Sequence, residues 1–408
     1  MTINQVGQRR VAIFEEPDGS YAVDHTGTPG DFLDLPIVHG SLKVNPGFQM
    51  KDPMTQKQYL LSHDKLVPGR QRPTVSFDIV LAPLGTAFGA STTTFDTDDS
   101  AILRMLKIVF GGFDGGVNAG SAVAGTPSNA YTIPVTTGHG SRFTAKTVVG
   151  LVDSNGRVEH RKILSKSTDD LNLYHGGTFT PADTSAVYNT CSVWMTGRPD
   201  TTLQMITEGA GTHDRWKYLG GYCTSANLTL GNDEFPKLSL TFEFVHMEAL
   251  SSQAITLASY LNFSPQWKTG KLLIAPYSAS GGQTATELCA QDRSFGLALQ
   301  QEPLFCSSAE YGVRRPFRPR VDPPVFTFTI PDESNTYYDA VLSGAEFQIS
   351  QQINDDPDNS LSIFGTRCQV INCEPVGDSL DQQTVTLRPI PITNASSDLS
   401  RSPVTIHF

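Results

Sequence analysis

The sequence predicts a mainly β protein made of two β domains, each with one short helix. Apolar and polar residues alternate in several short runs, which is the pattern of half-buried strands. Glycine and proline are frequent, at 35 and 26 of 408 residues, as expected for a chain with many turns. A basic stretch bounded by prolines leads into an alternating run twice, at 69–83 and at 314–331. A chain of this length is too long for one ordinary core, so two domains with elaborations are expected.

Residues 1–30 predict an extended arm, which is charged, rich in glycine and proline, and carries one apolar stretch at 11–14. An arm of this kind becomes ordered when it lies on a neighbour. From 31 to 85, two alternating runs flank a long polar connection. This pattern predicts a long hairpin, or two strands joined by an extended flap. The first domain is expected to span 31–250.

Residues 95–113 show the strongest helix pattern of the chain. An Asp-rich opening leads into a periodic apolar run, and the pair Gly111 and Gly112 ends it. Residues 114–185 are rich in Gly, Ser and Thr and contain short strand patterns. We expect them to be an insertion in the first domain or an outer elaboration of it.

Alternating runs return after the expected insertion. The runs at 218–231 and 236–248 are separated by a short turn, "GNDEFP", which predicts a hairpin. In the second of these runs the apolar set is expected to face the core: Leu238, Leu240, Phe242 and Phe244.

The second domain is expected to span 251–408 and to end in a C-terminal extension. Its elements repeat the order of the first domain in a shorter form. A strand at 294–307 precedes the basic element, and 333–344 stands in the place of the helix. The stretch 345–365 matches 226–244 as strand, acidic turn and strand. This order predicts an internal duplication; the alternative is two unrelated β domains that share hairpins.

Charge and cysteine content exclude some classes of function. The formal net charge is −11 and the isoelectric point is near 5.3, the opposite of the balance in a protein that grips nucleic acid through its phosphates. No apolar run is long enough for a spanning helix, and the N-terminus lacks the apolar core of a signal peptide. The 6 cysteines form no CxxC pair, which favours reduced thiols in a cytoplasm.

No sequence motif for chemistry stands out. The 9 histidines show no metal-binding spacing, and the chain lacks a complete phosphate loop or a serine-nucleophile elbow. The acidic turn at 354–360 could collect a cation weakly, although a solvated turn is the simpler reading. We therefore expect no catalytic residues, no metal site, no cofactor and no enzymatic activity.

Three stretches resemble the tail tube protein (major tail protein) family of long-tailed bacteriophages. The first is the opening "FEEPDGSYAVDHTG" with the strand "FLDLPIVHGSLKV". The second is the flap "GRQRPTVSFDIVLAP", and the third is "YLGGYCTSANLTLGNDEFPKLSLTFEFVHME". Single-domain members of that family are much shorter than this chain. The sequence is more similar to the version with two fused tube domains, in which a trimer gives a ring of pseudo-six-fold symmetry; a hexamer is the alternative.

The resemblance implies a fold of two sandwich-like or partial-barrel domains that contribute strands to an intersubunit β-barrel. Alternation would then place polar side chains on the channel. The side chains expected to face the lumen are Lys237, Ser239, Thr241, Glu243, Gln348 and Ser350. In the strand that holds the last two, Phe347 and Ile349 are expected to face the core.

The proline-rich flaps are expected to project, because proline cannot complete a strand ladder. Their arginines would bind carboxylates of a neighbouring subunit or ring. These arginines are Arg70, Arg72, Arg314, Arg315, Arg318 and Arg320. The acidic turns expected to receive them hold Asp233, Glu234, Asp355 and Asp356. The alternatives are a solvated basic loop and, less favoured by the acidic chain, a nucleic-acid clamp.

The resemblance implies a structural virion protein that assembles into stacked rings in the host cytoplasm and resides in the virion tail. DNA would pass through the tube without specific binding, and other tail proteins would meet the tube at its ends. The alternative is a β-sandwich that binds carbohydrate or a receptor at a virion or cell surface. A glycan-cleaving enzyme would need two carboxylates across a cleft, which the sequence does not place.

Overall fold

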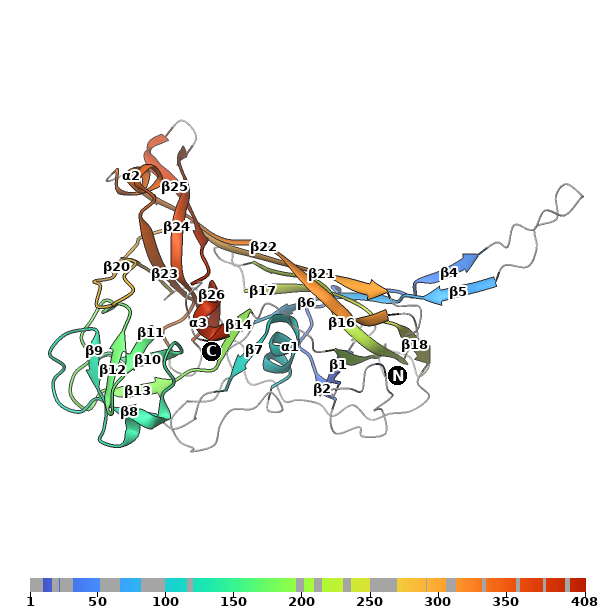
Figure 1. Cartoon of the computed structure of the whole chain (residues 1–408), viewed down its shortest axis with the longest axis horizontal. Helices are drawn as coiled ribbons and strands as arrows, with labels where there is room; N and C mark the ends of the chain where they lie inside the picture. Colours follow the sequence, from blue (N-terminus) through green and yellow to red (C-terminus); the bar gives the residue numbers. More distant parts are fainter. Residues whose placement is uncertain are drawn as a thin grey trace, which may run out of the picture.

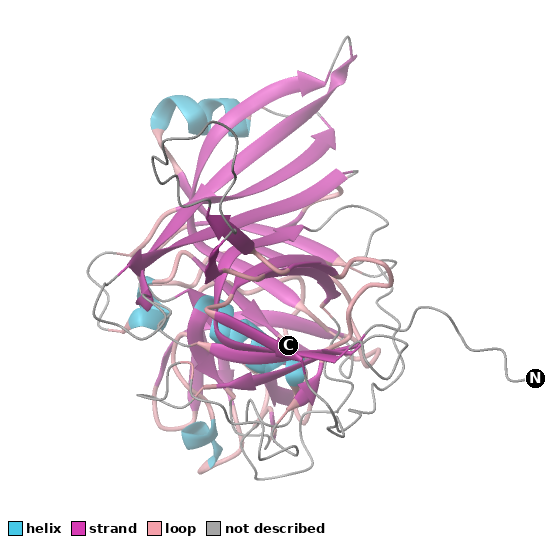
Figure 2. Ribbon diagram, turned by 90° about the vertical axis from the view of Figure 1, so that its right-hand side faces the viewer, coloured by secondary structure: helices cyan, strands magenta, loops and turns pink. Residues whose placement is uncertain are grey.

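The computed structural model confirms a mainly β chain with few helices. The structure describes residues 10–16, 22, 32–51, 67–81, 100–115, 120–195, 202–208, 215–229, 236–249, 270–290, 292–305, 313–331, 335–356, 360–376, 379–392 and 397–408. Most strands join one large antiparallel sheet, which curls into a partial barrel (Figures 1 and 2).

The first repeat consists of the strands before the helix α1 (Ala101–Phe110) and four strands between residues 203 and 249. Its strands are β1 (Arg10–Glu15), β2 (Leu33–Asp34), β3 (Lys43–Asn45), β4 (Phe48–Lys51), β5 (Val67–Gln71), β6 (Thr74–Val80), β15 (Leu203–Glu208), β16 (Arg215–Thr229), β17 (Lys237–Glu243) and β18 (His246–Ala249). β3 and β4 form one interrupted strand, which pairs with the interrupted strand β5 and β6.

The second repeat contains the helix α2 (Thr336–Ser343), and the strand after this helix begins at Glu346, with no insert between them. Its strands are β19 (Lys271–Pro276), β20 (Thr286–Glu287), β21 (Asp292–Phe305), β22 (Val313–Pro331), β23 (Glu346–Gln352), β24 (Ser362–Val376), β25 (Ser379–Pro389) and β26 (Val404–His407). A short helix, α3 (Asp398–Arg401), precedes the last strand.

The two repeats have the same strand pairing. β1 lies between β2 and β15, as β19 lies between β20 and β23. β6 pairs with β17 and β17 with β16, as β22 pairs with β25 and β25 with β24. β16 also pairs with β15 and β18, as β24 pairs with β23 and β26. β26 therefore takes the position of β18 and completes the second repeat.

The registers repeat together with the pairing. The register shifts after Leu203 in β15·β16 and after Phe347 in β23·β24. A second irregularity follows Cys223 in β16·β17 and Val370 in β24·β25. Individual residue pairs also match between the repeats. The pair Phe242–Val75 corresponds to Leu387–Phe326, and the pair Val44–Val75 corresponds to Phe295–Phe326. The pair Ala12–Asp34 corresponds to Leu273–Glu287.

One part of the sequence alignment between the halves was wrong. The stretch 346–365 occupies the place of 203–218, as β23 and the start of β24, whereas the hairpin 226–243 corresponds to β24 and β25. Both 203–218 and 226–243 have the pattern strand, turn, strand, so the sequence pattern cannot show which of them corresponds to 346–365. The strand pairing in the structure shows it.

The helix α1 forms where the apolar periodicity predicts it. The hydroxyl of Ser100 accepts a hydrogen bond from the Leu103 amide and caps the first turn. Gly111 ends the helix in the left-handed region, at φ 86°, which glycine adopts without strain. α2 ends in the same way at Gly344.

An insert at 120–191 interrupts the first repeat between β7 (Gly111–Asp114) and β14 (Ser192–Met195), which pair with each other. It contains β8 (Ser121–Ala122), β9 (Thr132–Pro134), β10 (Val148–Val152), β11 (Val158–Lys166), β12 (Asp170–Leu173) and β13 (Ala186–Asn189), which form a separate sheet. A bridge from Val123 to Val135 joins the two edges of this sheet. The insert has its own apolar core and lies beside β23 (Figure 1).

Candidate assembly surface

One face of the large sheet packs on the apolar core and the opposite face is polar. In the segment 237–244, the four side chains that were predicted to face the core are buried, which confirms the expectation: Leu238, Leu240, Phe242 and Phe244. The side chains between these residues are only half-buried. Their rungs continue across the sheet as a polar face, formed by Ser76, Asp78, Ser225, Asn227, Lys237, Ser239, Thr241, Glu243, Thr327, Asn372, Thr384 and Thr386.

Hydroxyl and amide groups dominate the polar face, and some of them bond across strands. The hydroxyls of Ser76 and Thr241 lie 3.0 Å apart. Lys237 forms an ion pair of 3.7 Å with Asp78. Paired charges and neutral hydroxyls give a surface with little net charge, which offers few fixed counter-charges to a polyanion.

The six residues expected to face a lumen fall into two groups. Lys237, Ser239, Thr241 and Glu243 lie on the polar face. The expectation is wrong for Gln348 and Ser350, which are buried within the chain. The Gln348 amide donates to the carbonyl oxygens of Tyr174 and Pro276, because the insert covers this part of β23. Of the pair expected to face the core, Ile349 is buried and Phe347 is half-buried against the core.

The structure places the flap arginines on two long hairpins. Arg70 lies in β5, and Arg72 follows it, donating its backbone amide to Gly47. The other four lie in the first half of β22, which pairs with the end of β21: Arg314, Arg315, Arg318 and Arg320. Figure 1 shows β4 and β5 projecting from the body of the sheet. The two arginine clusters thus occupy equivalent hairpins of the two repeats.

The acidic turns differ in what the structure describes. Asp233 and Glu234 lie outside the described residues. Asp355 is largely buried, its carbonyl accepts from the Val158 amide, and its carboxylate lies 3.7 Å from Arg157. This turn therefore holds the insert. The amide of its neighbour Asp356 donates to the side chain of Asn354.

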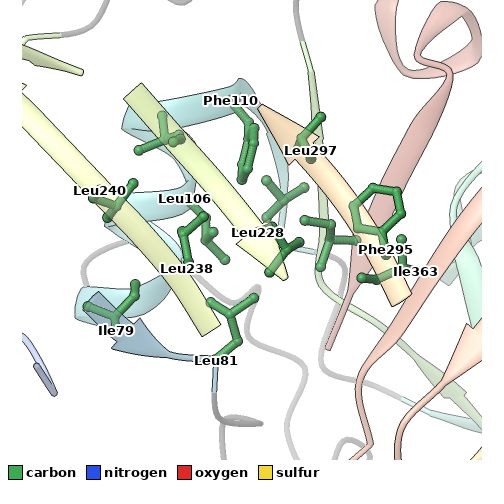
Figure 3. Close-up of a cluster of buried hydrophobic side chains, with 14 of the residues drawn as sticks. Ile79, Leu81, Leu106, Phe110, Leu228, Leu238, Leu240, Phe295, Leu297 and Ile363 are labelled. Carbon is green, nitrogen blue, oxygen red and sulfur yellow. The ribbon is translucent and has the colours of Figure 1, made fainter. Parts of the chain in front are cut away.

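The two repeats meet in an apolar joint, where residues 225–229 of β16 pair with 296–300 of β21. Leu228 lies opposite Leu297, and both are buried. Figure 3 shows Leu106 and Phe110 of α1 beside this rung. The helix thus covers a sheet that passes without interruption from one repeat to the other.

A second contact, the polar joint, connects β11 of the insert to the second repeat. The ring nitrogens of His160 lie 2.6 Å from the hydroxyl of Ser362 and 2.8 Å from that of Ser360. Lys162 donates to the hydroxyls of Thr366 and Thr405. The sequence pattern did not predict this joint. Its signal was the polar run Glu159–Lys162 inside a strand, which is unusual for a buried position.

Burial shifts the protonation equilibria of the polar joint. Burial lowers the pKa of His160 to about 4, against a smaller opposing effect of Glu159. It lowers the pKa of Lys162 to about 7, with Lys146 acting in the same direction. His407, which lies 2.8 Å from the Ser192 hydroxyl, has its pKa lowered well below the usual value by burial and by Lys162. All these shifts favour neutral side chains.

A fully buried ion pair lies next to the polar joint. The guanidinium of Arg161 donates to Glu159 at 2.7 Å. Burial raises the pKa of Glu159, but Arg161, Thr178 and Lys271 together hold it below its usual value. Gly177 at φ 62° passes directly over the pair, and a side chain there would collide with Glu159. The ion pair fixes the insert against Lys271 of the second repeat.

The described residues include a cavity but no metal-binding cluster. They contain no group of three or more His, Cys, Asp or Glu side chains that could hold a metal ion. An open cavity of about 490 Å³ between β19, β22 and α2 has mainly apolar walls, including Ile274, Tyr337 and Phe347. None of the helices in the described part of the chain is both long and apolar enough to cross a membrane.

No model of a known protein family matches the chain, and no curated protein matches it either.

Proposed function

We propose that this protein is a structural subunit of a tube, of the kind formed by phage tail tube proteins, and that it has no enzymatic activity. The observation that carries the proposal is the repeated unit, whose sheet passes from one repeat to the next and exposes a polar face. Two copies of one unit within a chain, joined edge to edge, are what a ring of such units requires.

The polar face would line the channel, and the apolar face with α1 would lie on the outside. A channel wall of hydroxyls and paired charges, such as Lys237 with Asp78, provides few sites where phosphates could bind. DNA would therefore slide through the tube without specific binding. The net charge of −11 supports this use, because it opposes tight binding of a polyanion.

Each chain supplies two units, so a trimer would give a ring of pseudo-six-fold symmetry; a hexamer is the alternative. The arginine hairpins, β5 and the first half of β22, would contact the next ring. Such rings would assemble in the host cytoplasm and function in the virion tail, with other tail proteins at the tube ends.

Electron microscopy of the purified protein tests the proposal directly. We expect rings or stacked tubes with an open channel as the protein concentration rises. A protein that stays monomeric at high concentration and binds glycans would instead be the β-sandwich binding module, and the proposal would fail. Among the described residues, the exposed aromatic side chains lie on three separate elements, Trp216 in β16, Tyr131 in the turn before β9 and Tyr338 in α2, which does not favour that alternative.

The channel role has a separate test in the tubes themselves. The double variant Ser239→Lys and Thr241→Lys adds positive charge to the polar face without changing a core residue. Tubes of this variant should retain DNA at low salt and release it at high salt, whereas wild-type tubes should retain none. The matched control, the double variant Thr126→Lys and Ser128→Lys in the exposed part of the insert, should behave as wild type. Equal retention by both variants would place the channel elsewhere.

A further inference from the structure

We propose that residues 372–376 of β24 pair with residues 45–49 of a second copy, in the register that joins the two repeats inside one chain. This inference rests on the proposed function. It adds the partner surface of the ring, the direction of assembly and the register of the contact.

The apolar joint supplies the template. β16 pairs first with β15 and then, from Ser225 to Thr229, with β21 of the second repeat. β24 is the equivalent of β16 and pairs with β23 up to Gln369. Beyond that point, the described residues place no strand on this edge of β24. The last part of β24 therefore presents the strand edge through which, in the first repeat, β16 pairs with β21.

The opposite end of the sheet has the complementary edge. β21 is the equivalent of β3 and β4, because Phe295 pairs with Phe326 as Val44 pairs with Val75. β21 uses one edge for β22 and the other for β16. Along one edge, β3 pairs with β6 and β4 pairs with β5. No other described strand pairs with β3 or β4. The described strands thus leave one edge of each kind without a strand beside it, which is a head-to-tail arrangement.

The equivalent positions fix the register. Inside the chain, Ser225 pairs with Gln300, Ala226 with Leu299, Asn227 with Ala298, Leu228 with Leu297 and Thr229 with Gly296. Between chains, the corresponding rungs are Asn372 with Gln49, Cys373 with Phe48, Glu374 with Gly47, Pro375 with Pro46 and Val376 with Asn45. The two prolines share one rung, so the two residues that lack an amide proton face each other.

Side-chain exposure supports the comparison between the filled and the free edges. Phe295 is 1% exposed at the apolar joint, whereas its equivalent Val44 is 37% exposed at the free edge. Leu228 is buried, whereas its equivalent Pro375 is exposed. Positions that the internal joint covers are therefore open at the two ends of the chain, as expected for a joint that a second copy closes.

The helix next to the free edge is also uncovered. α2 packs on β24, and its side chains Tyr338, Val341 and Leu342 are exposed. α1 buries almost all of its residues, because it covers the apolar joint. Apolar residues at spacing i, i+3 and i+4 form one helix face. A second copy on the β24 edge would supply the missing cover at this end of the molecule.

A disulfide can test the register, because opposed strand residues lie about 4.5–5.5 Å apart between Cα atoms, within the range that a disulfide spans. The variant Phe48→Cys places a thiol opposite the native Cys373. Under oxidation we expect covalent multimers that run as a ladder on non-reducing gels and collapse on reduction. The double variant Ala226→Cys with Leu299→Cys is the positive control, because it should form the same bond within one chain.

Three controls make the result specific. Adding Cys373→Ser to Phe48→Cys should abolish the ladder. Gln49→Cys, at the next position of the strand, should give none, because successive positions of a strand alternate between its two faces. Val44→Asp should prevent ring formation without unfolding the chain, whereas Tyr131→Asp, which changes a residue of similar exposure in the insert, should not.

The outcomes separate this inference from the proposed function. Rings that form while Phe48→Cys gives no ladder would overturn the register and leave the tube intact. A ladder of equal strength with Cys373→Ser would also overturn it. A chain that remains monomeric under all conditions would overturn both.

Discussion

Both joints hold the first repeat to the second, but one consists of apolar contacts and the other of buried hydrogen bonds. The apolar joint pairs Leu228 with Leu297 under α1. The polar joint holds β11 of the insert to the second repeat through hydrogen bonds of His160 and Lys162. Apolar contacts hold a sheet together at any pH, whereas buried polar groups impose one orientation and depend on their protonation.

This difference indicates a division of roles. The apolar joint continues a ladder that every unit can repeat, so it suits an assembly of many copies. The polar joint occurs once in each chain, because only the first repeat carries the insert. Buried polar networks specify a unique arrangement, and this network would keep the insert in one place on the second repeat.

The largest effect is expected at the apolar joint. Leu228→Ala should lower the free energy of unfolding by about 2–5 kcal/mol, because it opens a cavity in a packed site. Leu342→Ala on α2, where the side chain is 72% exposed, should change the stability of the unassembled chain by no more than ~0.5 kcal/mol. Urea unfolding of both variants gives the comparison. Similar losses in the two would show that the joint is not a tightly packed site.

Lys162 should make the stability of the chain rise with pH in the neutral to alkaline range. Its folded pKa of about 7 lies below the ordinary value of 10.5, so the unfolded chain binds more protons between these values. Stability should therefore rise with pH from 7 towards 10.5, by up to about 1.4 kcal/mol per pH unit. The difference in stability between wild type and Lys162→Met isolates this group. A pH-independent difference would mean that the amine is solvated.

Acid should weaken the polar joint through His160, over a narrower pH range than the one in which Lys162 acts. The folded pKa of His160 is about 4 against an ordinary 6.5, so the unfolded chain again binds more protons in between. The contribution of this group is constant above pH 6.5 and falls as the pH drops to 4. The stability difference between wild type and His160→Asn should follow this curve. Hydrogen exchange should then show β11 opening before β16, and simultaneous opening would contradict the comparison.

The smallest effect is expected at the rim of the polar joint. Arg157 is well exposed and lies 3.7 Å from the Asp355 carboxylate. Arg157→Ala should cost less than about 1 kcal/mol and should lose even that at high salt. Arg161→Ala, which removes one partner of the buried Glu159 and leaves Lys271, should cost about 3 kcal/mol by comparison. Thermal melts at low and high salt distinguish the two, and equal costs would place the buried pair in contact with solvent.

Local patterns were sufficient to predict α1, the hairpin of β16 and β17, and the buried face of β17. Each of these depends on neighbours within a short stretch of chain. The polar joint could not be predicted in this way, because the partners of His160 lie in β24, far along the chain. Gln348 and Ser350 were assigned to the wrong environment for the same reason. Alternation separates two faces, but it does not show that the insert covers the polar one.

The pairing of β1 with β15 has a consequence for synthesis. Arg10 pairs with Glu208, so β1 has only the short strand β2 beside it until the ribosome has made the whole insert and then β15. In the second repeat, β19 meets β23 after a much shorter stretch, from Lys271 to Gln352. Long-range pairing slows folding, so a nascent chain would complete its first half late. A cell that makes this protein in quantity therefore has to shield a half-finished chain, and holding chaperones should be found on it before translation ends.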